Sequence, residues 1–194
     1  MIKIVSKSEW TEVEILVQEN LDQTERMEAA AKAVKEKKIK QFSVNVEQWI
    51  QTYGLEVLSD LIQGMILSGY EQIRFPKRER KEMEIELVGI SEPLLDQAKK
   101  IAKEAEVVAK NICFARDLVN LPANYLRPDD FVREVKEKLT GTGVEAECLN
   151  GQQLREQGLN GILAVGDASA FPPCLLILRY QNNPESSETL GLVG

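Results

Sequence analysis

The sequence predicts an α/β protein in which strands and helices alternate along the chain. Segments between the predicted strands carry apolar residues every three or four positions, which is the spacing of an amphipathic helix. The order strand, helix, strand near the start favours a parallel pair joined by a right-handed crossover. Apolar or alternating segments typical of strands occur at residues 2–5, 13–17, 39–46, 83–90, 144–149, 175–180 and 190–193.

The composition predicts an ordinary globular protein with a buried core. Of its 194 residues, 43% are hydrophobic and 28% are charged. The formal net charge of -7 disfavours nucleic acid as a partner, because binding to phosphate chains depends on clustered Lys and Arg. The densest basic segment, 77–81, contains Glu79 and precedes Glu82, so a solvated loop is preferred to an anion contact. No apolar run approaches a membrane span and no signal peptide is evident, so we expect a cytoplasmic protein.

The absence of histidine and the spacing of the cysteines exclude several kinds of site. The chain contains no histidine, which excludes Ser-His-Asp and Cys-His catalysis and His-ligated zinc. Its three cysteines, Cys113, Cys148 and Cys174, form no CxxC pair and lie in apolar stretches. This pattern is typical of free structural thiols in a reducing compartment rather than of nucleophiles or metal ligands.

Two helices are predicted in the first part of the chain. The first covers 24–38, with Asp22 or Thr24 as its N-terminal cap, and the second follows Gly54 and ends near Gly69. The next strand, 83–90, alternates apolar residues with glutamates and is expected to be half-exposed, nearer an edge of the sheet than its centre. Its glutamates, Glu82, Glu84 and Glu86, share one side and could bind a cation, although a solvated face is the preferred interpretation.

The longest helical pattern begins at Pro93. Its apolar residues recur over roughly 27 residues, a length of about 40 Å, and they are Leu94, Ala98, Ile101, Ala105, Val108, Ile112, Ala115 and Val119. A helix of this length in a short chain favours a junction between two bodies. We therefore predict an N-terminal domain (1–92), a connecting helix (93–120) and a second domain (121–194), the alternative being one domain with a long core helix.

The second half continues the α/β pattern but adds no chemical site. Asp129 or Asp130 is expected to cap a helix ending near Leu139, a short helix is expected over 151–157, and strand 175–180 suits burial on both faces. Three glycines, Gly158, Gly161 and Gly166, match neither GxGxxG nor a Walker loop, so they are interpreted as turn glycines. The residues alone therefore reveal no active site.

Three segments nevertheless resemble the leucine aminopeptidase family. Residues 115–124, ARDLVNLPAN, followed by Pro128, resemble the family's "AR-(D/E)-LVN-x-P-x-N-x-x-x-P" entry to the catalytic domain. Residues 161–169 with Pro172 and Pro173 resemble its "AVG-x-x-S-x-x-PP" turn. Upstream, residues 63–70 resemble the "EG-x-x-L-x-x-Y" helix, and Arg74-Phe75 continue it, so the resemblance covers about 24–194.

The resemblance implies a macrodomain-like α/β N-terminal domain whose first strands are missing or rearranged, a connecting helix and the beginning of a catalytic α/β domain. It implies hexameric enzymes that release N-terminal residues from peptide substrates with two divalent metal ions, Mn²⁺, Zn²⁺ or Mg²⁺. Such metals generate hydroxide from a bridging water and polarise the scissile carbonyl. The family's ligands, a lysine and carboxylates, and its catalytic lysine and arginine lie on motifs that begin with a "GKG" continuing strand 190–194.

Because the chain ends at the first glycine of that motif, we expect no catalytic, metal or substrate-binding residue and no bound cofactor within it. Arg116 and Asn120 are expected to fix the helix exit and the following loop by hydrogen bonds, and the 158–173 turn to shape the sheet below the site. Segment 175–193 is expected to expose apolar edges that favour self-association. Two alternatives stay open: a macrodomain-like module that binds ADP-ribose, although its glycine loops are not evident before residue 110, and an interaction protein that kept the scaffold without the chemistry.

Overall fold

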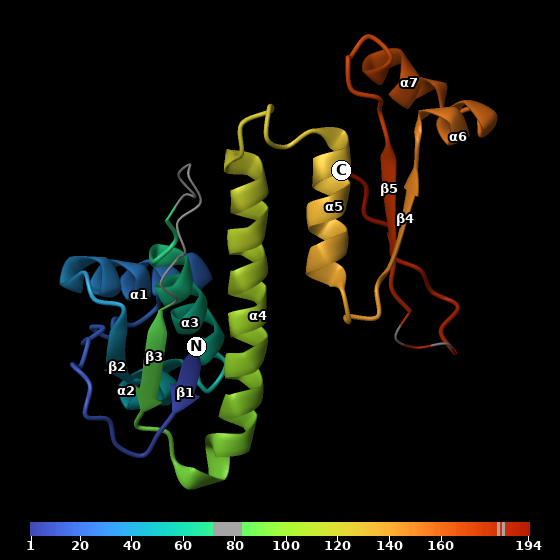
Figure 1. Ribbon diagram of the computed structural model, residues 1–194. Helices are drawn as coiled ribbons and strands as arrows, with labels where there is room; N and C mark the ends of the chain where they lie inside the picture. Colours follow the sequence, from blue (N-terminus) through green and yellow to red (C-terminus); the bar gives the residue numbers. More distant parts are fainter. Residues whose placement is uncertain (72–82, 182, 184) are drawn as a thin grey trace. The chain divides into compact units, whose positions relative to one another are not determined.

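Helices and strands alternate along the chain, which confirms the predicted α/β class (Figure 1). The structure, a computed structural model, describes residues 1–71, 83–181, 183 and 185–194. They form two units, Met1–Asn120 and Leu121–Gly194. Segment 77–81, Arg74-Phe75 and Glu82, which the sequence singled out, lie outside the described residues.

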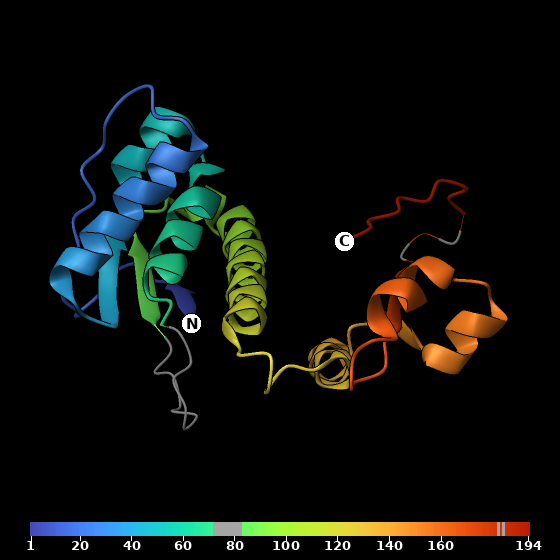
Figure 2. The same cartoon turned by 90° about the horizontal axis from the view of Figure 1, so that it is seen from above.

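The first unit contains a parallel sheet with the strand order β1-β3-β2. Its helix α3 packs between α1 and α4, and Figure 2 shows these three helices side by side. The elements in chain order are β1 (Ile2–Ile4), α1 (Gln23–Lys37), β2 (Gln41–Asn45), α2 (Glu47–Tyr53), α3 (Val57–Ser68), β3 (Glu84–Val88), a 3-10 turn η1 (Glu92–Leu94) and α4 (Leu95–Asn120).

Strand β3 is the centre of this sheet, so its predicted place near an edge is wrong. It pairs with β1 on one side and with β2 on the other. Ile85 and Leu87 are fully buried, whereas Glu84 and Glu86 on the opposite face are half-buried. The alternation correctly indicated that one face of the strand is covered, but it carries no information about how many strands pair with it.

Residues 13–17 do not form the predicted strand. A single parallel bridge joins Glu12 to Ser43 of β2, and the backbone N–H of Val13 donates to the carbonyl of Ser43 at 2.8 Å. Val13 and Ile15 are buried nonetheless. Their apolar side chains therefore reflect burial beside β2 rather than a regular ladder.

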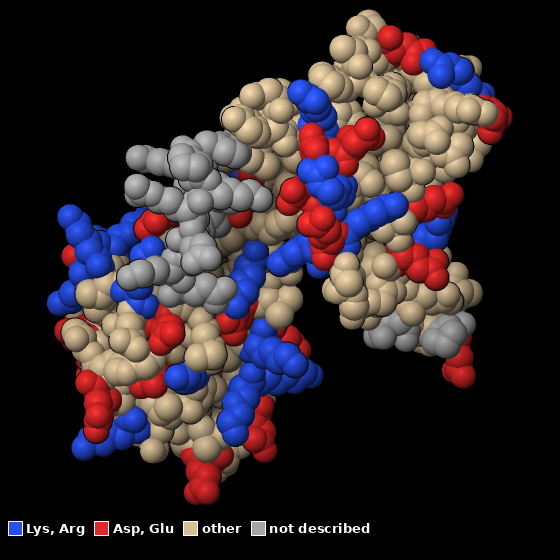
Figure 3. Space-filling model, viewed as in Figure 1, with Lys and Arg blue, Asp and Glu red and all other residues tan. Residues whose placement is uncertain are grey.

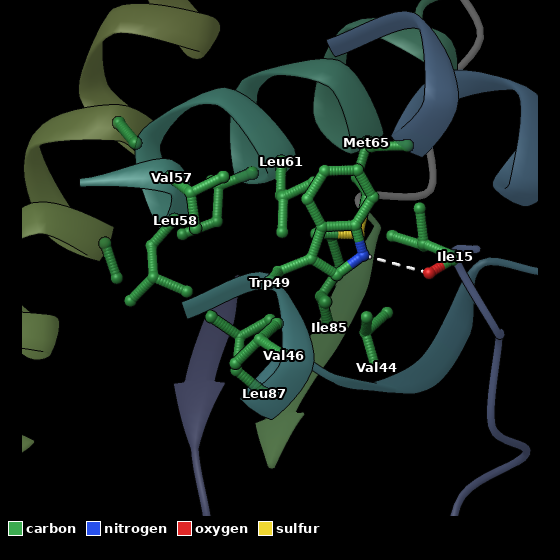
Figure 4. Packing of buried hydrophobic residues seen from close by; sticks show 14 of the residues in the cluster. Ile15, Val44, Val46, Trp49, Val57, Leu58, Leu61, Met65, Ile85 and Leu87 are labelled. Carbon is green, nitrogen blue, oxygen red and sulfur yellow. Dashed lines mark hydrogen bonds between the residues drawn. The ribbon is translucent and has the colours of Figure 1, made fainter. Parts of the chain in front are cut away.

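Helix α2, which was not predicted from the sequence, supplies the largest core side chain. Trp49 is fully buried, and its indole N–H donates to the carbonyl of Ile15 at 2.9 Å. Figure 4 shows its ring between α3 and the sheet, with Leu61 and Ile85 pointing toward it. A helix of seven residues is too short to show a convincing apolar period in sequence.

The ends of α1 and α3 follow their predicted signals. Asp22, not Thr24, caps α1: its carboxylate accepts the Glu25 N–H at 2.9 Å, and the Glu25 carboxylate accepts the Asp22 N–H at 2.8 Å. This reciprocal arrangement satisfies two backbone donors that the helix leaves unpaired. Gly69 caps the C-terminus of α3, donating its N–H to the carbonyl of Ile66 at 3.1 Å.

Helix α4 is 26 residues long and belongs to the first unit. Pro93 lies in the preceding 3-10 turn rather than opening the α-helix. Ala98, Ile101 and Ala105 of the predicted apolar stripe are buried, together with Ala102 and Ala109, and Leu94 is half-buried. Farther along, Val108 is 47% exposed and Val119 is 83% exposed, so the burial of this stripe stops before the end of the helix.

The second unit is built on a two-stranded antiparallel sheet, in which Leu149 pairs with Leu175 and Glu145 with Arg179. Its core consists of Leu149, Leu154 and Leu163, with Leu175 and Ile177 packed against them. The elements are α5 (Pro128–Leu139), β4 (Glu145–Leu149), α6 (Gly151–Glu156), α7 (Asn160–Gly166) and β5 (Leu175–Arg179).

Three expectations for this unit need correction. Strand β5 is not buried on both faces: it pairs only with β4 among the described strands, and Leu178 is 47% exposed. Residues 190–194 do not form the predicted strand. Leu190, Leu192 and Val193 are exposed. At α5 the cap is Arg127, whose N–H donates to Asp130 at 3.2 Å, so Asp130 supports the cap from inside the helix.

Helix α7 occupies part of the segment predicted as a glycine turn. Gly158 is a turn glycine as predicted, with φ of +69°. Gly166 has a different role, because a Cβ at this position would lie 2.4 Å from the Cβ of Pro173. The glycine therefore lets Pro173 pack directly on the end of α7.

Candidate functional site

The described ranges contain no ready-made metal site. Among these residues, no group of three or more His, Cys, Asp or Glu side chains could hold a metal ion. The two described glutamates of the predicted acidic face are engaged by neutral donors: Gln41 donates to Glu84 at 3.2 Å and Ser8 to Glu86 at 2.6 Å. These hydrogen bonds favour a solvated sheet face over a cation site.

The most organised group of family-motif residues lies at the C-terminal end of α4. We name it the Tyr70 cluster, formed by Tyr70, Arg116, Asp117 and Asn120. The Tyr70 hydroxyl donates to the Asp117 carboxylate at 2.9 Å and accepts from the Asn120 side-chain amide at 3.0 Å. The Arg116 guanidinium lies over the Tyr70 ring, 5.5 Å from its centroid.

The Tyr70 cluster positions α4 rather than performing chemistry. It ties the last turn of α4 to the residue that follows Gly69, the cap of α3. Asn120 makes the kind of hydrogen bond expected of it, but its partner is a tyrosine 50 positions earlier rather than the following loop. Arg116 contributes a cation–π contact of about 0.5–1 kcal/mol. No local signal in the sequence links Tyr70 to Asp117.

Replacing Tyr70 with Phe tests this positioning role. The variant keeps the aromatic ring beneath Arg116 and removes both hydrogen bonds of the hydroxyl. We expect a loss of about 1–2 kcal/mol and faster amide exchange in the last turn of α4, measured by hydrogen–deuterium exchange on residues 114–120. Tyr180→Phe, at a tyrosine that is 62% exposed, is the control. Unchanged exchange in the Tyr70→Phe variant would contradict the role.

In the second unit, two contacts of arginine side chains support the segment between α6 and β5. Arg155 donates to both carboxylate oxygens of Asp167 at 2.9 Å, joining α6 to the end of α7. The Arg127 guanidinium lies 4.1 Å from the centroid of the Phe171 ring. Because Arg155 and Asp167 are 58% and 46% exposed, their pair contributes at most about 1 kcal/mol. These contacts shape the turn without forming a site.

The three cysteines carry reduced thiols and are half-buried. Burial, followed by the neighbouring Cys148 thiol and the Asp129 carboxylate, raises the pKa of Cys174 to about 11. A thiol with this pKa stays protonated near neutral pH, whereas a nucleophilic cysteine works as its thiolate. Cys174 therefore behaves as a structural thiol, as the sequence predicted.

Among the described residues, the face of the first unit in Figure 3 gives no indication of a nucleic-acid site. On the face shown in Figure 3, acidic and basic side chains of the first unit are interspersed rather than gathered into a basic patch. Within the described part of the chain, no helix has the length and apolar character to cross a bilayer.

Comparisons with known protein sequences lead to one family. Residues 113–194 match the model for the catalytic domain of the cytosol aminopeptidase family. A probable cytosol aminopeptidase of Clostridium perfringens is 32% identical over 174 residues, covering 86% of this chain and 35% of the relative. One from Solibacter usitatus is 30% identical over 168 residues, covering 86% and 34%. The chain thus spans about a third of the length of these curated relatives.

Solved structures share the fold. The bottromycin maturation enzyme BotP in complex with Mn superposes with a TM-score of 0.70 at 24% identity, covering 84% of this chain and 34% of that one. A tomato leucine aminopeptidase mutant superposes with a TM-score of 0.65 at 23% identity, covering 84% and 34%. At these identities the likeness establishes the fold alone.

Proposed function

Because the chain belongs to the cytosol aminopeptidase family, we propose that it is the N-terminal portion of a metal-dependent leucyl aminopeptidase that releases N-terminal amino acids from peptides. The observation that carries the proposal is the catalytic-domain match over residues 113–194, which includes the motif segments 115–128 and 161–173. The curated relatives, all named probable cytosol aminopeptidases, support it. The parent enzyme would be cytoplasmic and would assemble into hexamers.

Within this proposal the described residues do not supply the metal centre. They contain no group of three or more His, Cys, Asp or Glu side chains that could hold a metal ion, and we propose that the two divalent ions, Mn²⁺, Zn²⁺ or Mg²⁺, bind to residues other than these. The complex of BotP with Mn supports a divalent metal in a protein of this fold. When bound, such ions would activate water and polarise the peptide carbonyl.

The role proposed for this portion is to support the site. The Tyr70 cluster fixes the C-terminal end of α4, and the bidentate Arg155–Asp167 pair and the contact of Gly166 with Pro173 fix the segment that leads into β5. Catalytic constellations depend on supporting elements that keep their geometry. We propose the division predicted from the sequence: an N-terminal domain over 1–92, a connecting helix over 93–120 and the first part of the catalytic domain over 121–194.

Hydrolysis of a leucine chromogenic amide in the presence of Mn²⁺ or Zn²⁺ tests the function. This chain should be inactive, and a version extended to the length of the relatives should be active. Activity of the 194-residue chain would show that its own carboxylates bind metal and that the assignment of the site elsewhere is wrong. Inactivity of both chains, with both folded by circular dichroism, would favour an interaction protein that kept the scaffold without its chemistry.

A further inference from the structure

Cys148 and Cys174 lie on the same face of the two-stranded sheet in the second unit. Cys148 pairs with Leu176 in the antiparallel register, and Cys174 is two residues before Leu176. Side chains two positions apart on a strand point to the same face, so the two cysteines are diagonal neighbours. The Cys148 thiol also contributes to the raised pKa of Cys174, so the two thiols are near each other.

From this juxtaposition we propose that Cys148 and Cys174 are a modification site at which a peroxide produces an intrachain disulfide between β4 and the start of β5. Diagonal cross-strand neighbours lie about 7–8 Å apart between Cα atoms, slightly more than the roughly 4.4–6.8 Å that a disulfide accepts. Cys174 precedes the first residue of β5, outside the ladder of hydrogen bonds. Its backbone can therefore move closer without breaking the strand pairing.

The chemistry balances with one peroxide per disulfide. One thiol loses its proton, and its sulfur attacks a peroxide oxygen, which breaks the O–O bond and releases water once the leaving oxygen is protonated. The resulting sulfenic acid is attacked by the second thiol, which forms the S–S bond and releases a second water. The two sulfur atoms are oxidised and the peroxide is reduced. Each chain loses two hydrogen atoms.

The surroundings make the first step slow and the second step fast. Burial and the Asp129 carboxylate disfavour the thiolate of Cys174, so the pair does not react as rapidly as a dedicated peroxide sensor. Once one sulfur is oxidised, however, the second thiol is nearby on the same face of the sheet. The expected product is therefore the disulfide rather than the higher oxidation states that isolated cysteines reach.

Trypsin places each cysteine in a separate peptide, which makes the test direct. Cleavage after Lys110, Arg116, Lys138, Arg155 and Arg179 isolates Cys113 in 111–116, Cys148 in 139–155 and Cys174 in 156–179. The folded chain is treated with hydrogen peroxide, remaining thiols are blocked with N-ethylmaleimide, and the digest is analysed by mass spectrometry with and without reduction.

The expected product joins peptides 139–155 and 156–179, in about tenfold excess over any pair that includes Cys113. Dithiothreitol should reverse it. The same treatment in urea is the control, because it measures how often each pair forms in the unfolded chain. There, loop closure alone favours Cys148–Cys174 over Cys113–Cys148 by less than about twofold. Cys148→Ser and Cys174→Ser should each abolish the cross-link, while Cys113→Ser should leave it unchanged.

Several outcomes would overturn the inference. These are sulfinic or sulfonic acids at Cys148 or Cys174 without the cross-link, bridges between chains in place of the internal one, or equal selectivity in folded and unfolded protein. The inference would also be overturned if Cys148 and Cys174 both stayed reduced under conditions that oxidise Cys113. None of these results depends on whether the parent enzyme is an aminopeptidase.

Discussion

Replacing Gly64 with Ala is expected to destabilise the first unit by about 2–3 kcal/mol. A Cβ at this position would lie 2.2 Å from the carbonyl oxygen of Met27 and 2.9 Å from its carbonyl carbon. These are backbone atoms of α1, so no side-chain rotation relieves the overlap. The two helices, α1 and α3, would have to separate.

Helix propensity acts in the opposite direction at Gly64. Alanine stabilises a helix interior by about 1 kcal/mol relative to glycine, and the predicted loss is what remains after this gain. The steric overlap outweighs the gain in helix propensity, because Gly64 and Met65 are buried and Ala30 of α1 is fully buried in the same core. Moving the helices apart would open that core along the whole contact.

Urea denaturation followed by tryptophan fluorescence measures the effect, since Trp49 is fully buried in this unit. Gly161→Ala is the matched control: it is also a glycine inside a helix, and a Cβ there would meet nothing within 4 Å. It should be neutral in this experiment, because Gly161 lies in the second unit and Trp49 in the first. Equal effects of the two substitutions would show that α1 and α3 do not pack this closely.

The contrast between these glycines illustrates what the sequence could predict. In the sequence, Gly64 stood out only because residues 63–70 resemble a helix of the family. That resemblance did not explain why a glycine is needed there. Its reason is a contact with the backbone of Met27 in another helix, which no local rule reports. Capping residues such as Asp22 were predictable because their partners lie within one turn.

The same distinction explains the errors. The alternation in β3 predicted its buried side chains but not its central place, because strand order depends on pairing with residues 2–4 and 41–45. The apolar stripe of α4 predicted the helix but not where its burial stops, because that depends on how far α3 and the sheet extend along it. In the Tyr70 cluster the sequence indicated Arg116 and Asn120 but missed that both act on Tyr70.

Arg26→Met is the other substitution with a large expected effect. The Arg26 guanidinium donates to Asp60 at 2.8 Å and 2.7 Å, and to the carbonyl of Leu21 at 2.7 Å. Asp60, on α3, is only 6% exposed. Methionine would retain much of the apolar volume but leave a buried carboxylate whose remaining side-chain donor is Gln23 at 3.2 Å, among the contacts described here. We expect a loss of about 3–5 kcal/mol.

The double variant Arg26→Met with Asp60→Leu separates the cost of the unpaired carboxylate from the value of the pair. A buried ion pair often contributes little net stability relative to apolar residues of similar volume, whereas breaking it on one side is costly. The double variant should therefore recover most of the loss in the same urea experiment.

Failure to recover would assign the effect to the other contacts of Arg26. These are the hydrogen bond to Leu21 and the stacking of the guanidinium 5.1 Å from the centroid of the Tyr53 ring. Tyr53 in turn accepts the Leu21 N–H at 2.9 Å, so Arg26 and Tyr53 hold the same turn before α1. In that case the principal role of Arg26 is to order the segment leading into α1, and Asp60 serves to orient its guanidinium.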